Sequence, residues 1–148
     1  MRTLLATVTL LLATTVAHAE DWVIKSSPHD VPTTADRLEA AIDDSPAAVA
    51  ARVDHQAAAA NAGLEMDPAT VLIFGNPALG TPLMQADPRA ALDLPLRVLV
   101  WEEEDGTSVG YLTVEALAAR YELGESEDTL ASIADALDAL TDRAVSAE

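Results

Sequence analysis

The segment TVLIFGNPALGTPLMQADPRAALDLPLRVLVW, residues 70–101, sets the architecture of the chain. Its two apolar runs, 71–74 and 96–101, are rich in Val, Leu and Ile and are too short for typical helices, so each predicts a β-strand. Glycines and prolines break the connector between them into short pieces. Thr81-Pro82 and Asp87-Pro88 each combine a helix-capping residue with a proline at the first helical position. We therefore expect two strands joined by two short helical turns.

The chain after this segment returns as a hairpin and then continues as helices. Residues 102–106, EEEDG, form a charged tip in which Asp-Gly suits a tight turn. Residues 107–111 form the returning strand. Thr113 is a candidate N-cap for a helix over 114–122, and Ser126 is one for the last helix. The apolar stripe of this last helix consists of Leu130, Ile133, Ala134, Leu137 and Leu140.

The chain before residue 70 supplies the remaining elements. Residues 22–26 form a short apolar run that predicts a first strand, and 35–43 carry apolar residues at helical spacing. Residues 49–55 alternate in the manner of a half-buried strand, and 56–61 are Ala-rich like a short helix. The resulting order, β-α-β-β-β-β-α-α, predicts an α+β domain with a mostly antiparallel sheet and helices on one face.

Residues 1–19 have the three parts of a secretory signal peptide. A short basic start is followed by the apolar run 4–16, and Ala17-His18-Ala19 is an A-x-A cleavage motif. The apolar run is too short to span a bilayer. We expect cleavage between Ala19 and Glu20, which makes the mature protein periplasmic or secreted.

Composition narrows the function classes. The chain has 25 acidic and 8 basic residues, a formal net charge of −17. It is therefore not expected to bind nucleic acid or an anionic membrane surface, and no apolar run after the leader is long enough to span a membrane. It has no cysteine, which excludes disulfides, thiolate metal sites and a cysteine nucleophile. We expect one domain over 20–124, followed by an amphipathic helix over 125–148 packed on or beside it.

Five short pieces of the chain match the pattern of one family. They are Val53-Asp54-His55, Ile73–Pro77, Gly80–Met84, Leu92–Leu96 and Val100–Glu102. On these pieces the chain resembles the DUF302 family, a bacterial and archaeal domain of unknown function, over about residues 23–123. The resemblance implies a compact α+β domain similar to the TBP-like arrangement β-α-β4-α, in agreement with the order of elements above. It implies no particular reaction.

Two features depart from the family pattern. Alanines occupy the strand before Asp54, where family members often carry larger apolar residues. Arg120-Tyr121 stands where they often carry a histidine. A site built on that histidine is therefore not expected in this chain.

The candidate metal ligands are His55 and Met84. A site of two histidines, His29 and His55, completed by a carboxylate or a methionine would suit zinc or copper. However, the sequence has no His-x-x-x-His or His-Glu-x-x-His motif. His55 lies on the apolar side of its predicted strand, which favours a histidine at the edge of the core with one hydrogen bond. We expect no metal and no other cofactor.

Two further positions carry polar groups at the ends of predicted elements. Phe74–Pro77 would present backbone N–H groups to an anion at a strand end. No basic residue follows before Arg89, so a conformational role for its Gly, Asn and Pro is favoured. Asp93 either caps the connector by accepting from backbone donors or acts as an acid or base together with Glu65 or Asp54.

Three hypotheses about function follow. The leading one is a non-enzymatic binding module for a small apolar ligand or a partner protein. The cleft expected for it is lined by Phe74, Leu83, Met84 and Trp101. The second is a hydrolase-like or metal-dependent enzyme that uses His55 with Asp54 or Glu65. The third is a structural homodimer whose exposed strand pairs edge to edge. The full set of candidate ligand-binding residues is His55, Phe74, Asn76, Leu83, Met84, Asp93 and Trp101.

Overall fold

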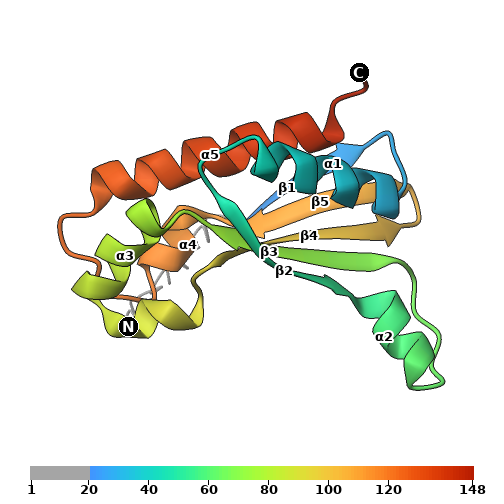
Figure 1. The fold of residues 1–148 in the computed structure, drawn as a ribbon, viewed down its shortest axis with the longest axis horizontal. Coiled ribbons are helices and arrows are strands. Elements are labelled where there is room, and N and C mark those ends of the chain that lie inside the picture. Colours follow the sequence, from blue (N-terminus) through green and yellow to red (C-terminus); the bar gives the residue numbers. More distant parts are fainter. Residues whose placement is uncertain (1–20) are drawn as a thin grey trace, which may run out of the picture.

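A five-stranded antiparallel sheet forms the centre of the computed structural model, which describes residues 21–148 (Figure 1). The strands are β1 (Trp22–Ser27), β2 (Ala48–Asp54), β3 (Ala69–Gly75), β4 (Leu96–Glu103) and β5 (Gly106–Leu112). Their spatial order is β1-β5-β4-β3-β2, so β1 and β2 form the two edges of the sheet. The predicted signal peptide and its cleavage site lie outside the described residues.

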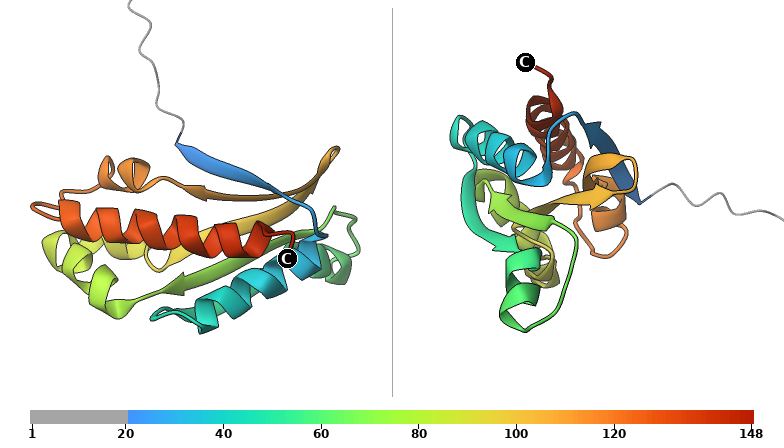
Figure 2. Two further views of the ribbon diagram at one scale, coloured as in Figure 1. Left: turned by 90° about the horizontal axis from the view of Figure 1, so that it is seen from above. Right: turned by 90° about the vertical axis from the view of Figure 1, so that its right-hand side faces the viewer.

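Two long helices, α1 (Val31–Asp43) and α5 (Glu127–Val145), lie side by side on one face of the sheet (Figure 2). The shorter helices are α2 (His55–Asn61), α3 (Pro77–Ala86), the 3₁₀ helix η1 (Pro88–Leu92) and α4 (Val114–Ala118). The predicted α+β class, the antiparallel sheet and the C-terminal helix are confirmed. Within residues 21–148, no helix combines the length and the apolar character that a membrane span requires.

Alternation along the central strands builds the core. Leu72 and Phe74 of β3, and Val98 and Val100 of β4, are buried under the two long helices. The buried apolar residues of α1 recur at helical spacing and are Val31, Ala35, Leu38, Ala41 and Ile42. The strand residues between the buried ones, such as Leu99, point to the opposite face, which neither α1 nor α5 covers.

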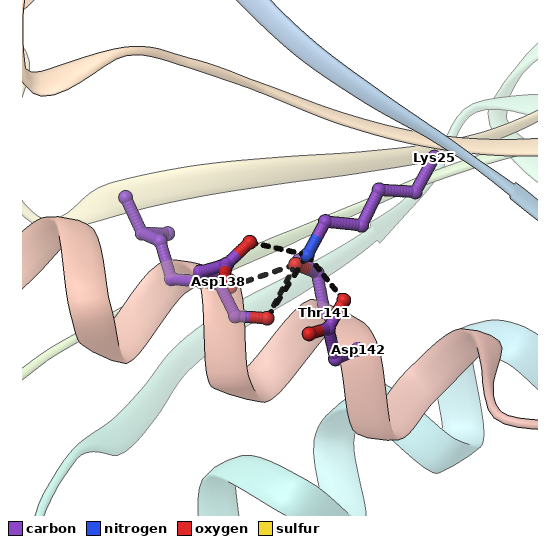
Figure 3. A network of polar contacts seen from close by, with 5 residues as sticks. Lys25, Asp138, Thr141 and Asp142 are labelled. Carbon is purple, nitrogen blue, oxygen red and sulfur yellow. Dashed lines mark hydrogen bonds and ion pairs between the residues drawn. The ribbon is translucent and has the colours of Figure 1, made fainter.

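Lys25, the only lysine of the chain, ties α5 to the edge strand β1 (Figure 3). Its Nζ lies 2.7 Å from Asp138 Oδ1 and 2.5 Å from Asp142 Oδ1. Burial lowers the pKa of Lys25, but the hydrogen bonds to Asp138 and Asp142 outweigh burial and leave that pKa raised. The lysine therefore stays charged and fixes α5 across the sheet.

Element boundaries differ from the predictions where a cap overrides the apolar pattern. Helix α1 begins at Val31, earlier than predicted, because Asp30 provides an N-cap with proline close behind it. Strand β2 ends at Asp54, whose side chain accepts a hydrogen bond from Ala57 N at 2.9 Å and so starts α2. His55, predicted to lie on a strand, is instead the first residue of α2.

The connector between β3 and β4 contains one continuous helix before its final turn. Asn76 caps α3 by accepting from Ala78 N at 2.9 Å, so the helix starts there and runs through Pro82. The first expected turn, which was to begin beside Pro82, is thus absorbed into a longer helix. The second expected turn is present as η1, and Asp87 caps it as predicted.

Candidate functional site

Three surface clefts contain the candidate residues that lie outside the core. The Asp93 cleft, of about 240 Å³, lies beside β4, β5 and α4. The Asn76 cleft, of about 330 Å³, lies between α3 and the neighbouring ends of β2 and β4. The His55 cleft, of about 500 Å³, lies near the start of α2. The first cleft adjoins the other two, because Leu96 lines it together with the Asn76 cleft and Leu99 lines it together with the His55 cleft.

The Asp93 cleft is apolar along most of its length. Its apolar walls include Trp22, Leu99, Leu112, Val114, Leu117 and Leu137. Thr113 starts α4 directly after β5, because its hydroxyl accepts a hydrogen bond from Ala116 N at 3.1 Å. Val114 and Leu117 are three residues apart and so share one face of α4, which forms one wall of the cleft.

Asp93 and Arg97 are the charged residues among those that line this cleft, and together they are called its polar end. Asp93 Oδ2 accepts from the Tyr121 hydroxyl at 2.7 Å and from Arg120 Nη1 at 3.0 Å, while Oδ1 accepts from Arg97 Nη1 at 3.4 Å. The Tyr121 hydrogen bond lowers the pKa of Asp93 most, burial opposes it, and the two arginines complete a net lowering. Asp93 is therefore a fixed carboxylate anion, and this environment does not suit a general acid.

A second aspartate, Asp87, positions the segment that follows α4. Asp87 is only 5% exposed, and its Oδ2 accepts from Glu122 N at 3.1 Å and from Arg89 Nη2 at 2.7 Å. Hydrogen bonds from Arg89 and from Glu122 N hold the pKa of Asp87 far below its usual range. Helix α4 ends at Ala118, earlier than predicted, and Arg120 N and Tyr121 N then donate to carbonyl oxygens three residues back instead of four.

The Asn76 cleft offers far fewer polar contacts. Its apolar lining includes Leu79, Met84, Leu94, Pro95 and Ile133. Among the described residues that line it, the polar side chains belong to Asn76 and Thr81, and none is charged. The oxygen of the Asn76 side chain is already engaged at the start of α3. This cleft can therefore hold an apolar group but can do little to orient a polar one.

The His55 cleft contains His55, Met66, Trp101 and Glu102. His55 is exposed, and within residues 21–148 no set of three His, Cys, Asp or Glu side chains is arranged to hold a metal ion. The Trp101 ring packs over Gly110, where an added Cβ would lie 2.9 Å from a ring carbon. Its Nε1 donates to Glu103 Oε1 at 3.0 Å. Trp101 is thus held in place as one wall of an open cleft.

A family model described as Domain of unknown function DUF302 matches residues 23–140 of this chain. The chain belongs to the DUF302 family. The fold of this DUF302 chain is also similar to the crystal structure of an uncharacterized conserved DUF302 protein from Bacillus stearothermophilus. The two superpose with a TM-score of 0.76 and 20% identity, over 85% of this chain and 99% of the other. At that identity the similarity shows a shared fold alone.

The DUF302 chain is also similar to parts of longer proteins. It is 44% identical over 109 residues to a protein named Fluoride-specific ion channel FluC 1 from Brucella suis. The matched region makes up 72% of this chain and 42% of the relative. A Brucella melitensis protein named Fluoride-specific ion channel FluC 2 matches at the same identity, over 40% of its length. This chain therefore spans about two-fifths of the length of these curated relatives, and the name describes those longer proteins.

The structure separates the four residues that the sequence grouped into one cleft. Phe74 is 2% exposed and Leu83 is 0% exposed, so both belong to the core of the DUF302 domain. Met84 lies in the Asn76 cleft and Trp101 in the His55 cleft. Alternation in β3 directs Phe74 to the same buried side as Leu72, which removes it from either cleft. His55 and Met84, the two candidate metal ligands, are likewise not brought together.

Asp93 has different partners from those considered in the sequence. Asp54 caps α2 and Glu65 is exposed in the loop after it, and neither lines the cleft that contains Asp93. Asp93 also accepts from side chains rather than from backbone N–H groups. Arg97 lies four residues after Asp93, but no helix joins the two, so the helical i,i+4 rule could not reveal this contact from the sequence. Arg120-Tyr121 stood out only as a departure from the family, because contact with Asp93 depends on the tertiary fold.

Proposed function

We propose that this DUF302 domain is a binding module for a small, mostly apolar molecule, which it takes up in the Asp93 cleft. The supporting observation is the pair Asp93 and Arg97, the charged residues of a cleft whose other lining side chains are largely apolar. Ligand pockets are typically concave and apolar, with a few placed polar groups that orient the ligand. Because both oxygens of Asp93 already accept hydrogen bonds from the protein, its arrangement favours binding over catalysis.

Titration with octanol, followed by amide NMR, tests this proposal. We expect saturable shifts at Leu112, Val114 and Arg97, together with a change in the fluorescence of Trp22, which also lines the cleft. Shifts confined to Leu79 and Gly80 would instead place the alcohol in the Asn76 cleft. That result, or the absence of saturable shifts, would overturn the proposal.

A matched pair of variants separates cleft binding from general surface binding. Leu112→Trp adds a large ring inside the Asp93 cleft, whereas Leu64→Trp adds the same ring to an exposed leucine in the loop after α2. Octanol binding should weaken in the first variant and stay unchanged in the second. Equal effects of the two substitutions would contradict binding in this cleft.

The Brucella relatives favour a second candidate function, in which the domain acts together with a fluoride channel. The observation is that proteins with that name contain a region 44% identical to this chain and more than half of their length lies outside it. The test compares fluoride flux through vesicles that contain the full-length Brucella suis protein or a form without the matched region. Equal flux from both forms, with and without added DUF302 domain, would overturn this candidate.

We also propose that the mature domain is exported, as its first 19 residues predict. Expression of the full chain with separation of periplasm, culture medium and cytoplasm would locate it. N-terminal sequencing of the exported form should begin at Glu20. A protein that retains Met1 and stays in the cytoplasm would contradict this proposal.

A further inference from the structure

We propose that the ligand of the Asp93 cleft is a small carboxylate with an apolar tail, whose charged group binds Arg97. This inference rests on the proposed function and adds a chemical class to it. It follows from the hydrogen-bonding capacity left at the polar end of the cleft, from the charge of the groups there and from the size of the cleft.

The hydrogen-bonding groups that stay unused at the polar end are N–H donors of Arg97. Asp93 accepts three hydrogen bonds through its two oxygens, from Tyr121, Arg120 and Arg97. Arg97 donates to Asp93 at 3.4 Å and to the Leu92 carbonyl oxygen at 2.8 Å. A guanidinium has five N–H donors, so Arg97 keeps donors that Asp93 and Leu92 do not use. A ligand acceptor would therefore find partners more readily than a ligand donor.

The charges at this end also favour an anion. Arg97 and Arg120 both pair with the single carboxylate of Asp93, so these three side chains together carry one excess positive charge, and Arg97 is the arginine among them that lines the cleft. The arginine side chains are 51% and 47% exposed, whereas that of Asp93 is 18% exposed. Arginine binds carboxylates well because its planar fork can donate two parallel hydrogen bonds. A carboxylate that enters the cleft would therefore meet the more exposed Arg97 before it meets Asp93.

The acidic character of the whole protein opposes an anionic ligand, but only at long range. The chain carries a formal net charge of −17. At physiological ionic strength, interactions between exposed charges are largely screened beyond about 8 Å. Direct contact with Arg97 acts well inside that distance. We therefore expect the net charge to slow association at low salt, while local contacts decide the affinity at physiological salt.

The cleft volume limits the length of the tail. A space of about 240 Å³ corresponds to the liquid volume of about eight water molecules. An eight-carbon chain is therefore comparable in size to the cleft. Octanoate, octanol and octylamine share this tail and differ in the head group, which makes them suitable probes.

The experiment measures the affinity of the three probes for the mature protein by calorimetry at physiological ionic strength, with amide NMR to locate each one. We expect octanoate to bind about tenfold more tightly than octanol, since one charge-assisted hydrogen bond contributes on this scale. Octylamine should bind more weakly than octanol, because Arg97 repels it and both oxygens of Asp93 already accept hydrogen bonds. All three should shift the amides of Leu112 and Val114.

Arg97→Gln should weaken octanoate binding more than octanol binding and so remove the preference for octanoate. Arg143→Gln serves as the matched control, because its side chain is 53% exposed, it binds Asp44 at 2.7 Å, and it lies outside the Asp93 cleft. It should leave the affinity of all three probes unchanged. If Arg97→Gln does not fold, the comparison of head groups on the unmodified protein still decides the outcome.

The outcomes separate this inference from the proposed function. If octanol and octanoate both bind in the cleft with equal affinity, the binding function stands and the carboxylate class is overturned. If octylamine binds most tightly of the three probes, the carboxylate class is also overturned, and a cationic ligand bound by Asp93 is indicated instead. If none of the three probes shifts the cleft amides, the proposed function itself is overturned.

Discussion

The Asp93 cleft and the Asn76 cleft are neighbours, yet only one of them carries charge. They share Leu96, and α5 contributes Leu137 to the first and Ile133, one turn earlier, to the second. Their apolar walls are similar in kind. The difference arises because the segment after α4 brings Arg120 and Tyr121 to Asp93, whereas Asn76 is used within its own helix. Two clefts with similar apolar walls therefore differ in the ligands they suit, because the segments that border them supply different polar groups.

Removing the α5 side chain from each cleft should have the largest effect. Leu137 is 2% exposed and Ile133 is 3% exposed, so Leu137→Ala and Ile133→Ala should each reduce the free energy of unfolding by about 2–5 kcal/mol. Denaturant unfolding measures this loss. Leu137→Ala should also allow the Asp93 cleft to bind decanol, whereas Ile133→Ala should not. Equal binding of decanol by both variants would show that the two clefts are not separate.

A methyl group added to a glycine beside each cleft should have a smaller and unequal effect. In Gly110→Ala the new Cβ would lie 2.9 Å from the Trp101 ring, whereas in Gly75→Ala it would lie 3.3 Å from Pro95 Cβ. Gly110→Ala should therefore cost about 1–3 kcal/mol of stability and move Trp101. Gly75→Ala should cost less. Thermal unfolding and tryptophan fluorescence measure both effects, and an unshifted Trp101 spectrum in Gly110→Ala would contradict the packing described.

Loss of the Asp93 charge should destabilise the protein in a pH-dependent way. Asp93→Asn removes charge-assisted hydrogen bonds, so the free energy of unfolding at neutral pH should fall by about 1–3 kcal/mol. Because the pKa of Asp93 is lowered in the folded state, its contribution is present above the pKa of an unfolded aspartate, about 3.9. It is lost as the pH falls through the folded pKa. The stability difference between the protein and the variant should therefore shrink at acid pH, and a constant difference would disprove this assignment.

Asn76→Ala, the corresponding change beside the other cleft, should have the smallest effect. It removes the side-chain cap of α3 and should cost about 1 kcal/mol of stability. Asn76 carries no titratable group, so the loss should be the same at neutral and acid pH. Octanoate binding in the Asp93 cleft should not change. A change in that affinity would show that the two clefts are coupled through Leu96.

The order of strands and helices was predictable because it depends on local patterns. Apolar runs around Leu72 and Val98, and helical spacing in α1 and α5, are visible in the sequence and survive in the fold. The candidate site was predicted only in part. Asn76, Asp93 and Trp101 do line clefts, but Phe74 and Leu83 are buried in the core. Apolar type alone does not indicate whether a side chain faces a cleft or the core.

The sequence by itself determined the α+β class and the family, because strand runs, caps and short motifs act over a few residues. The tertiary structure alone decided which side chains meet Asp93. Arg120 and Tyr121 lie 27 and 28 residues from it along the chain, and Asp87 holds that segment in place through Glu122 N. A contact over such a separation depends on how the sheet and helices pack. The polar end of the cleft is therefore a product of packing, built from residues whose local patterns show no sign of it.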